Sequence, residues 1–447
     1  MLAIGVAFAV IVGGGFRIHV GEIRLSVTSP LGPLLIAFLS LGTRHALHRH
    51  PNIVERYGPR WAALVRTAAW RATWPPFVAS RVGLLIVGAL AVYTVGYPRG
   101  EPRSRTSDNE LLNLPMRWDA GWYYRIASVG YHWDPLETGQ QNIAFFPAYP
   151  LTMRVVARLF GGSDMAYVFA GVAVSHVAFA WSLLLLYQLA RATIGDEDAA
   201  RGAVLLIACY PFSIYYGAIY TESLFLLGTV GAFLEFRRGR WAAAAAWGVL
   251  AGLTRPNGLL LAAPLAVMAI QSRWRRDHGS PWRRWAGPAA AVVAPLTGMA
   301  MFSFYIAALT GDPLAWSTQH AAWGRTFTGA GPLLTSAQAV ADHGLVTFLA
   351  TRPYDVINGA AAVAVACAIV PIGRRLGLPY AVFIVVNLLP PLALGGTMSM
   401  GRFTSTMFPV FLWLAAASPK GTVGIAVLFA VLQGFVGVLF YTWRPLY

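Results

Sequence analysis

Four short segments of this 447-residue chain carry charged side chains among apolar or aromatic neighbours, and these residues could do chemistry. Asp119 follows a tryptophan, Glu222 lies in a Tyr-Thr-Glu-Ser sequence, Arg255 precedes Pro-Asn-Gly, and Arg402 stands between a glycine and a phenylalanine. A carboxylate can take a proton from a hydroxyl group, and an arginine offers a permanently charged fork of donors that suits phosphate. The residue types therefore indicate a site that handles hydroxyl and phosphate groups.

Aromatic residues around Asp119 favour a sugar-binding site. Trp118 precedes the acid, and Trp122 and Tyr123 follow it closely. Aromatic faces stack on sugar rings, so we predict that these three residues line a sugar pocket and that Asp119 is the catalytic base. A structural alternative is that Asp119 caps a helix that begins near Ala120, and the two roles are compatible.

The other polar residues of these segments also have two interpretations. Arg255 and Arg402 are candidates for binding a phosphate, but they could instead pair with Glu222 or with lipid headgroups. We expect Glu222 to orient other groups rather than to act as the base. We place Glu222 and Asn257 in the substrate pocket.

The composition identifies the elements that must hold these residues. Hydrophobic residues make up 57% of the chain and charged residues only 12%, whereas a soluble domain carries roughly 25% charged residues. A cytosolic globular protein is therefore nearly excluded. The net charge of +16 would suit nucleic acid, but the basic residues lie between long apolar runs, so we interpret them as a topology signal and expect no nucleic-acid partner.

Apolar runs without Asp, Glu, Lys or Arg are the candidate membrane spans, since a spanning helix needs about 20 apolar residues. They are residues 1–16, 25–43, 82–98, 165–190, 202–221, 223–234, 241–254, 256–272, 285–311, 356–373, 376–401, 403–419 and 421–443. The two tight pairs at 202–234 and 241–272 could each be two short spans or a re-entrant hairpin, and the first run could alternatively be a signal peptide. The sequence predicts an all-α polytopic membrane protein with about 11–13 transmembrane helices.

The charges of the connecting segments predict the orientation in the membrane. When the chain is threaded through all candidate spans, most basic residues, Arg81 among them, lie on the N-terminal face. By the positive-inside rule that face is cytoplasmic. The four charged segments all reach the opposite face. We therefore predict a multi-pass protein of the cell (plasma) membrane, with a cytoplasmic N-terminus and an extracytoplasmic active site.

Two regions can be distinguished along the chain. Residues 1–97 hold N-terminal spans and a cytoplasmic, Arg- and Trp-rich amphipathic segment at 44–77, which we expect to lie on the lipid surface. Residues 98–447 form the transmembrane core, with extracytoplasmic loops at 98–145 and 310–355. The sequence has no Walker A loop, no dinucleotide fingerprint and no metal-ligand cluster, so we predict no cofactor and no metal.

Five segments carry a resemblance to a known family. They are RWDAGWYYRIASVGY (117–131), AFFPAYP (144–150), YTESLFLL (220–227), LTRPNGLLL (253–261) and GRFTSTMFPVF (401–411). In these segments the chain resembles the PIG-V family of mannosyltransferases, which are membrane glycosyltransferases of the GT-C superfamily. The stretch after Thr310, with Gln319, His320 and Arg325, looks like the bacterial members, and the Ala-, Arg-, Gly- and Trp-rich composition is actinobacterial-like.

The resemblance implies a GT-C fold and an activity. A polyprenyl- or dolichyl-phosphate-linked mannose would be the donor, a hydroxyl of a lipid-linked glycan the acceptor, and the anomeric carbon would be inverted. Asp119 matches the family's Trp-Asp motif and would be the base. Arg402, Arg255 and, third, His320 would bind the donor phosphate, and Gln319 would join the substrate pocket. The eukaryotic members act on GPI anchors, but the acceptor of this chain is left open.

Other functions compete with this interpretation. The same fold could use another polyprenyl-phosphate sugar, such as glucose or arabinose. A lipid or sugar transporter would favour charges at mid-span and two halves related by a repeat, neither of which the sequence shows. A non-enzymatic assembly subunit with a decayed site is disfavoured by the presence of Asp119, Arg255 and Arg402. The expected partners are the donor lipid, the glycan acceptor and membrane lipids.

Overall fold

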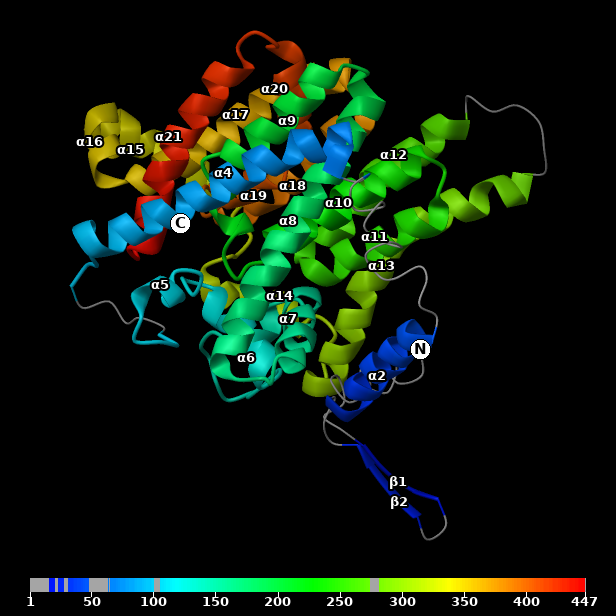
Figure 1. Cartoon of the computed structure of the whole chain (residues 1–447). Helices are drawn as coiled ribbons and strands as arrows, with labels where there is room; N and C mark the ends of the chain where they lie inside the picture. Colours follow the sequence, from blue (N-terminus) through cyan, green and yellow to red (C-terminus); the bar gives the residue numbers. More distant parts are fainter. Residues whose placement is uncertain are drawn as a thin grey trace.

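The computed structural model describes residues 16–20, 23–27, 31–47, 63, 65–99, 105–273 and 281–446. The described regular structure is helical except for one antiparallel hairpin, in which β1 (Phe16–Val20) pairs with β2 (Ile23–Val27). This hairpin lies at the lower end of the molecule in Figure 1. Its sequences, FRIHV and IRLSV, alternate apolar and polar residues with the period of a strand. The all-α prediction is confirmed apart from this hairpin. Its second strand contains the first residues of the predicted span 25–43.

The helical elements follow one another with short connections. In chain order they are α2 (Leu31–Leu47), α4 (Ala68–Leu90), η1 (Ala91–Val95), α5 (Glu110–Asn113), α6 (Ala120–Ser128), η2 (Asn142–Ala144), α7 (Ala148–Leu159), α8 (Asp164–Ile194), α9 (Glu197–Cys209), η3 (Ser213–Tyr216), α10 (Glu222–Arg237), α11 (Trp241–Thr254), η4 (Pro256–Leu261), α12 (Ala262–Arg273), α13 (Pro281–Thr310), α14 (Ala315–Thr318), η5 (Gln319–Trp323), α15 (Gly331–His343), α16 (Leu345–Thr351), α17 (Pro353–Arg375), α18 (Leu378–Gly395), α19 (Met400–Ser405), α20 (Pro409–Ala417) and α21 (Thr422–Tyr441).

Six helices of the described part are long and apolar enough to cross a membrane, so the chain is a multi-pass membrane protein. They are Ala68–Val95, Asp164–Ile194, Trp285–Thr310, Pro353–Arg375, Leu378–Gly395 and Thr422–Tyr441. The predicted 11–13 spans are not all of full length. The signal-peptide alternative at 1–16 and much of the amphipathic segment at 44–77 lie outside the described residues.

The remaining apolar runs form shorter helices. With 13 residues in α9 and 14 in α11, each measures about 20 Å, less than the roughly 30 Å hydrocarbon core of a bilayer. The tight pairs predicted at 202–234 and 241–272 are therefore helices that end short of a full crossing. The polar segments after α9 and α11 lie between helices rather than on a surface.

Helix α10 is the centre of the bundle. Every residue from Glu222 to Phe236 is buried, and α10 packs against α8 and α11, while α11 packs against α13. A Cβ on Gly252 would lie 2.1 Å from the Pro295 carbonyl oxygen, so only glycine permits the α11–α13 contact. Close approach through small residues is typical of helices in membranes. The packing fixes where α10 begins and where α11 ends, and both positions carry site residues.

Arg81 lies elsewhere than predicted. It belongs to α4, near the middle of the span Ala68–Val95, and not to a cytoplasmic connection. Its buried guanidinium donates to the Ser213 carbonyl at 2.8 Å and to the Ser213 hydroxyl at 3.0 Å, and it lies 4.9 Å from the Phe179 ring centre. A charge at this depth needs such polar partners. Helix α4 begins at Ala68, well before the apolar run 82–98 from which the span was predicted. Arg81 was therefore assigned to the connection before that run.

Candidate active site

Asp119 lies in a strained turn at the start of α6. The preceding Trp118 has a φ of 56°, in the left-handed region that a tryptophan rarely adopts. The Tyr220 hydroxyl bridges this turn, because it accepts from the Asp119 N–H at 3.0 Å and donates to the Arg117 carbonyl at 3.1 Å. The Asp119 carboxylate makes no capping hydrogen bond to α6. Asp119 therefore precedes α6 as expected, but its side chain does not cap the helix, and the carboxylate is left for other contacts.

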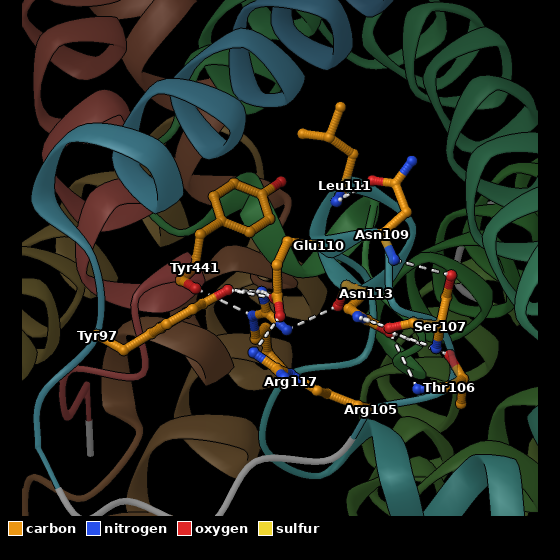
Figure 2. Close-up of polar contacts among 10 residues, drawn as sticks. All are labelled: Tyr97, Arg105, Thr106, Ser107, Asn109, Glu110, Leu111, Asn113, Arg117 and Tyr441. Atoms are coloured by element: carbon orange, nitrogen blue, oxygen red, sulfur yellow. Dashed lines mark hydrogen bonds and ion pairs between the residues drawn. The ribbon is translucent and has the colours of Figure 1, made fainter.

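Arg117 anchors the segment that leads into this turn. Its guanidinium donates to the carbonyls of Tyr441 at 3.0 Å and Asn113 at 2.9 Å, and to the Tyr97 hydroxyl at 3.0 Å. Glu110 accepts a 2.5 Å hydrogen bond from the same hydroxyl and lies 3.8 Å from the guanidinium. Figure 2 shows these residues converging from the connection before α6 and from the end of α21. Arg117 is 1% exposed, and its guanidinium holds this segment in place through these contacts.

Arg402 joins two carboxylates that are distant in sequence. Its Nη1 lies 2.6 Å from Asp119 Oδ2, and its Nε donates to Glu222 Oε1. Arg255 Nη1 lies 2.5 Å from the same Glu222 oxygen. The Tyr220 ring lies 4.5 Å from the Arg402 guanidinium. The four charged segments predicted to share one face thus meet, and we call Asp119, Glu222, Arg255 and Arg402 the ion cluster.

Two helix boundaries and one short helix supply three of the four members. Glu222 is the first residue of α10, and Arg255 is an extended residue between α11 and η4. Pro256 explains the break, since the residue before a proline is disfavoured in a helix. Arg402 lies in the short helix α19, where a Cβ on Gly401 would lie 2.0 Å from the Phe212 ring. Only glycine lets α19 approach this closely.

Each carboxylate of the cluster keeps one oxygen without a protein partner among the described residues. Glu222 Oε2 is buried and accepts no hydrogen bond. Asp119 is held through Oδ2, its side chain is 30% exposed, and its other oxygen accepts no hydrogen bond from the described part of the chain. Burial opposes the charge of Arg402, but Glu222 and Asp119 outweigh this effect and raise its pKa. The cluster therefore holds fixed charges with two acceptor oxygens to spare.

Sequence reasoning missed Arg325 as a site residue. It follows η5 after a left-handed Gly324 (φ 70°), and its guanidinium lies 5.1 Å from the Phe403 ring centre. Arg255 lies 5.0 Å from the same ring. Burial and the nearby charge of Arg402 lower the pKa of Arg325 to about 10, so it stays charged at neutral pH. Sequence alone could not place it, because the contact depends on how the 310–330 segment folds back.

An aromatic wall flanks Asp119 on α6. Trp122 stacks on Phe145 with ring centres 5.7 Å apart, and the Trp323 ring lies edge-on to both at 5.6 and 5.4 Å. All three rings are half-buried. Tyr123 is buried beside Phe145 at 5.1 Å. We call Trp122, Phe145 and Trp323 the aromatic wall. Phe145 lies in the AFFPAYP segment, and Trp323 lies in the stretch that looks like the bacterial members, although neither was predicted as a pocket residue.

Three predicted residues hydrogen-bond elsewhere. Gln319 donates to the Gly139 carbonyl at 2.6 Å, and Asn257 donates to Asn387 at 2.7 Å, so neither is bonded to the ion cluster. His320 Nδ1 lies 2.8 Å from the Trp316 carbonyl oxygen. Burial lowers the pKa of His320, so its ring is neutral at pH 7 and does not offer the positive charge expected of a phosphate ligand.

The other predicted pocket residue, Trp118, packs 5.1 Å from the Trp443 ring. Among residues 105–273, 281–446 and the shorter described segments, no group of three or more His, Cys, Asp or Glu could hold a metal ion. The absence of a metal cofactor remains a prediction.

Comparisons with known proteins converge on one family. Residues 104–282 match the family model described as Mannosyltransferase (PIG-V). The chain is 29% identical over 218 residues to GPI mannosyltransferase 2 of Drosophila pseudoobscura pseudoobscura, which covers 42% of this chain and 47% of that protein. It is 27% identical over 157 residues to the Homo sapiens GPI alpha-1,6-mannosyltransferase 2, covering 34% and 30%. The chain thus matches less than half the length of these curated relatives.

Solved structures match the chain only at low similarity. ArnT from Cupriavidus metallidurans, bound to undecaprenyl phosphate, has a TM-score of 0.44 and 14% identity over 81% of this chain and 76% of that chain. The apo oligosaccharyltransferase of Archaeoglobus fulgidus has a TM-score of 0.42 and 13% identity over 82% and 56%. The resemblance seen in the motifs is confirmed by the family match, since residues 104–282 of this chain match the PIG-V mannosyltransferase family.

Proposed function

We propose that the chain is a GT-C type mannosyltransferase of the cell membrane. It transfers mannose from polyprenyl-phosphate-mannose to a hydroxyl of a lipid-linked glycan on the extracytoplasmic face, with inversion at the anomeric carbon. The observation that carries the proposal is the ion cluster: a carboxylate with an accessible free oxygen, Asp119, lies within hydrogen-bond distance of an arginine in a cationic site. The PIG-V match over residues 104–282 supports mannose as the sugar.

The transfer step follows from this geometry. The acceptor hydroxyl oxygen forms a bond to the anomeric carbon, and its proton moves to the free oxygen of Asp119. The bond from that carbon to the phosphate oxygen breaks, and its electron pair stays on the phosphate. Arg402 holds the other Asp119 oxygen at 2.6 Å, so the base is oriented before the substrate arrives. General bases contribute about 10²–10⁴-fold in rate.

The leaving phosphate needs positive charge rather than a proton, because a phosphodiester becomes a phosphomonoester. Arg402 and Arg255 supply this charge in a buried site, where it is stronger than in water. Burial lowers the pKa of His320, so its ring is neutral and acts as a hydrogen-bonding group rather than as a positive charge. A lipid-linked donor also fits a site outside the cytoplasm, because nucleotide sugars stay in the cytosol.

Sugar recognition is assigned to the surroundings of Asp119. The aromatic wall presents half-buried rings that can stack on a sugar face. Trp118 and Tyr123 shape the pocket from the α6 turn. Glu222 borders the pocket and orients Arg402 and Arg255. Asn257 and Gln319 line its edges.

A transfer assay tests the proposal. The purified full chain receives polyprenyl-phosphate [¹⁴C]mannose and a lipid extract of its host. We expect a new labelled glycolipid together with an equal amount of polyprenyl phosphate, and the mass of the product identifies the acceptor. If label stays on the mannose donor but moves from a glucose or arabinose donor, the assignment of the donor sugar must be changed. Label that only relocates across a vesicle membrane would favour a transporter and contradict transfer.

A further inference from the structure

The charges around the ion cluster do not balance. Three arginines, Arg255, Arg325 and Arg402, face two carboxylates, Asp119 and Glu222. Arg255 and Arg402 both form ion pairs with these acids. Arg325 forms no ion pair with any described residue, and its hydrogen bond to the Met398 carbonyl is long, at 3.5 Å. A partly buried charge without a counter-charge is costly, so an anion is expected to bind beside Arg325.

Phe403 brings the unpaired arginine to the others. The guanidinium carbons of Arg325 and Arg255 lie 5.1 and 5.0 Å from the centre of this single ring. Phe403 is also the residue after Arg402, whose guanidinium enters the ion cluster. Two guanidinium groups therefore lie against one ring, and the third belongs to the residue that precedes it in the chain. Arginines gathered around a planar ring offer several N–H donors to a tetrahedral anion.

We propose that Arg325 binds the phosphate of the donor lipid and remains bound to it as the sugar leaves. Arg255 and Arg402 are already engaged with Glu222 and Asp119, so Arg325 is the arginine of the site whose donors are least used. The proposal rests on the proposed function and names a phosphate ligand beyond Arg402, Arg255 and His320.

The charge count through the reaction supports this assignment. The empty site has one net positive charge from these five residues, and a bound phosphodiester with one negative charge neutralises it. During transfer the phosphate gains a negative charge as the carbon–oxygen bond breaks, while Asp119 loses its charge by accepting the hydroxyl proton. The sum stays at zero. Without Arg325 the other four residues and the bound phosphate would carry a net negative charge both before and after the step, in a site of low polarity where this is costly.

Binding of polyprenyl phosphate to the purified full chain tests the proposal independently of turnover. In Arg325→Gln we expect binding about 10- to 100-fold weaker than in wild type, the usual loss of a hydrogen bond between charged groups. Arg325→Lys keeps the charge but not the fork, so it should recover part of the affinity. Arg352→Gln is the matched control. Arg352 lies in the same 310–355 segment, is 52% exposed and pairs with Asp355 at 3.9 Å. It should bind like wild type.

Further arms separate the outcomes. Inorganic phosphate is a second probe: displacement of the labelled lipid at concentrations similar to the lipid's own would show that the site takes free phosphate, and would overturn the assignment to the donor. Arg325→Met keeps the packing on Phe403 and replaces Arg325→Gln if the latter fails to fold. Binding by an uncharged Arg325 variant within threefold of wild type also overturns the proposal. If wild type binds the lipid through Arg325 but transfers no mannose, the proposed function fails and the phosphate assignment stands.

Discussion

Two carboxylates share one arginine in this site, but their surroundings give them different tasks. The Asp119 side chain is 30% exposed and can meet a substrate hydroxyl, whereas the Glu222 side chain is fully buried between Arg402 and Arg255. A buried acid between two arginines maintains geometry, because removal of its charge leaves cations unpaired. This contrast supports Asp119 as the base and Glu222 as the residue that orients the arginines.

Glu222→Gln should destabilise the protein. The substitution keeps the side-chain shape but removes the charge that pairs Arg402 and Arg255, and a broken buried pair costs about 3–5 kcal/mol. The melting temperature of the purified protein in detergent measures the loss. Glu197→Gln is the control, because its exposed pair with Arg201 contributes about 0–1 kcal/mol. Equal melting temperatures for Glu222→Gln and wild type would show that Glu222 does not hold the cluster.

His320 makes a pH-dependent contribution to stability. Burial lowers its pKa in the folded state, so the unfolded state binds more protons between the lowered value and about 6.5. Stability must therefore fall as pH decreases through that window. We expect the melting temperature of wild type to fall more between pH 7.5 and 5 than that of His320→Gln. Parallel pH curves for the two proteins would contradict a buried, neutral His320.

Sequence reasoning found the charged members of the site but not the contacts that organise them. Asp119, Glu222, Arg255 and Arg402 stand out because charges among apolar residues are conspicuous in any single sequence. Arg325 lies in a polar loop where an arginine is unremarkable. The Tyr220 hydroxyl bridges a backbone turn, and no residue pattern encodes that turn.

At the scale of elements, the site depends on where helices stop. The α6 turn, the start of α10, the break between α11 and η4, and the short α19 each deliver one charged residue. The apolar runs predicted these helices because their length and composition suit a membrane. The ends of these helices were harder to predict. Pro256 marks one break in the sequence. That α9 and α11 stop short of a full crossing is visible only in the folded bundle. The β1–β2 hairpin was missed although its strands alternate polar and apolar residues.

The α6 turn gives a sharp test at this scale. Tyr220→Phe keeps the ring beneath Arg402 and removes the hydroxyl that bridges Arg117 and Asp119. A strained turn that loses such a hydrogen bond should lose about 1–3 kcal/mol of positioning, which corresponds to about a 10- to 100-fold lower kcat with little change in donor KM.

Tyr215→Phe is the matched control for this test. Tyr215 also lies beside the Arg402 guanidinium, at 5.4 Å, but its hydroxyl makes no hydrogen bond to the described residues. The Tyr215→Phe enzyme should keep near wild-type kcat. Equal losses in the two variants would mean that the hydroxyl bridge does not position Asp119.

The whole molecule is needed to complete the site. The family match ends at residue 282, yet Arg402 lies far beyond it and binds both Asp119 and Glu222. The end of α21 anchors Arg117 through the Tyr441 carbonyl. Residues from both halves of the chain therefore meet around one cluster. The predicted bacterial origin and the division at residue 98 remain predictions.

The orientation of the chain in the membrane is tested by cysteine labelling. Cys209 and Cys367 are free and are first replaced by alanine. Leu136, which is 89% exposed in the 98–145 loop, and Lys420, between α20 and α21, are then changed to cysteine one at a time. In intact cells a membrane-impermeant maleimide should label Leu136→Cys, and Lys420→Cys only after permeabilisation. The reverse pattern would place the site on the cytoplasmic face.

The most direct measurement is the rate of mannose transfer by Asp119→Asn. The variant keeps the size of the side chain and removes its ability to take a proton, so the initial rate should fall about 10²–10⁴-fold, while polyprenyl phosphate binding stays within a few fold of wild type. Asp108→Asn, in an exposed position of the same loop, should transfer at the wild-type rate. Near wild-type turnover by Asp119→Asn, with the donor bound normally, would contradict the assignment of the base and with it the mechanism proposed for the ion cluster.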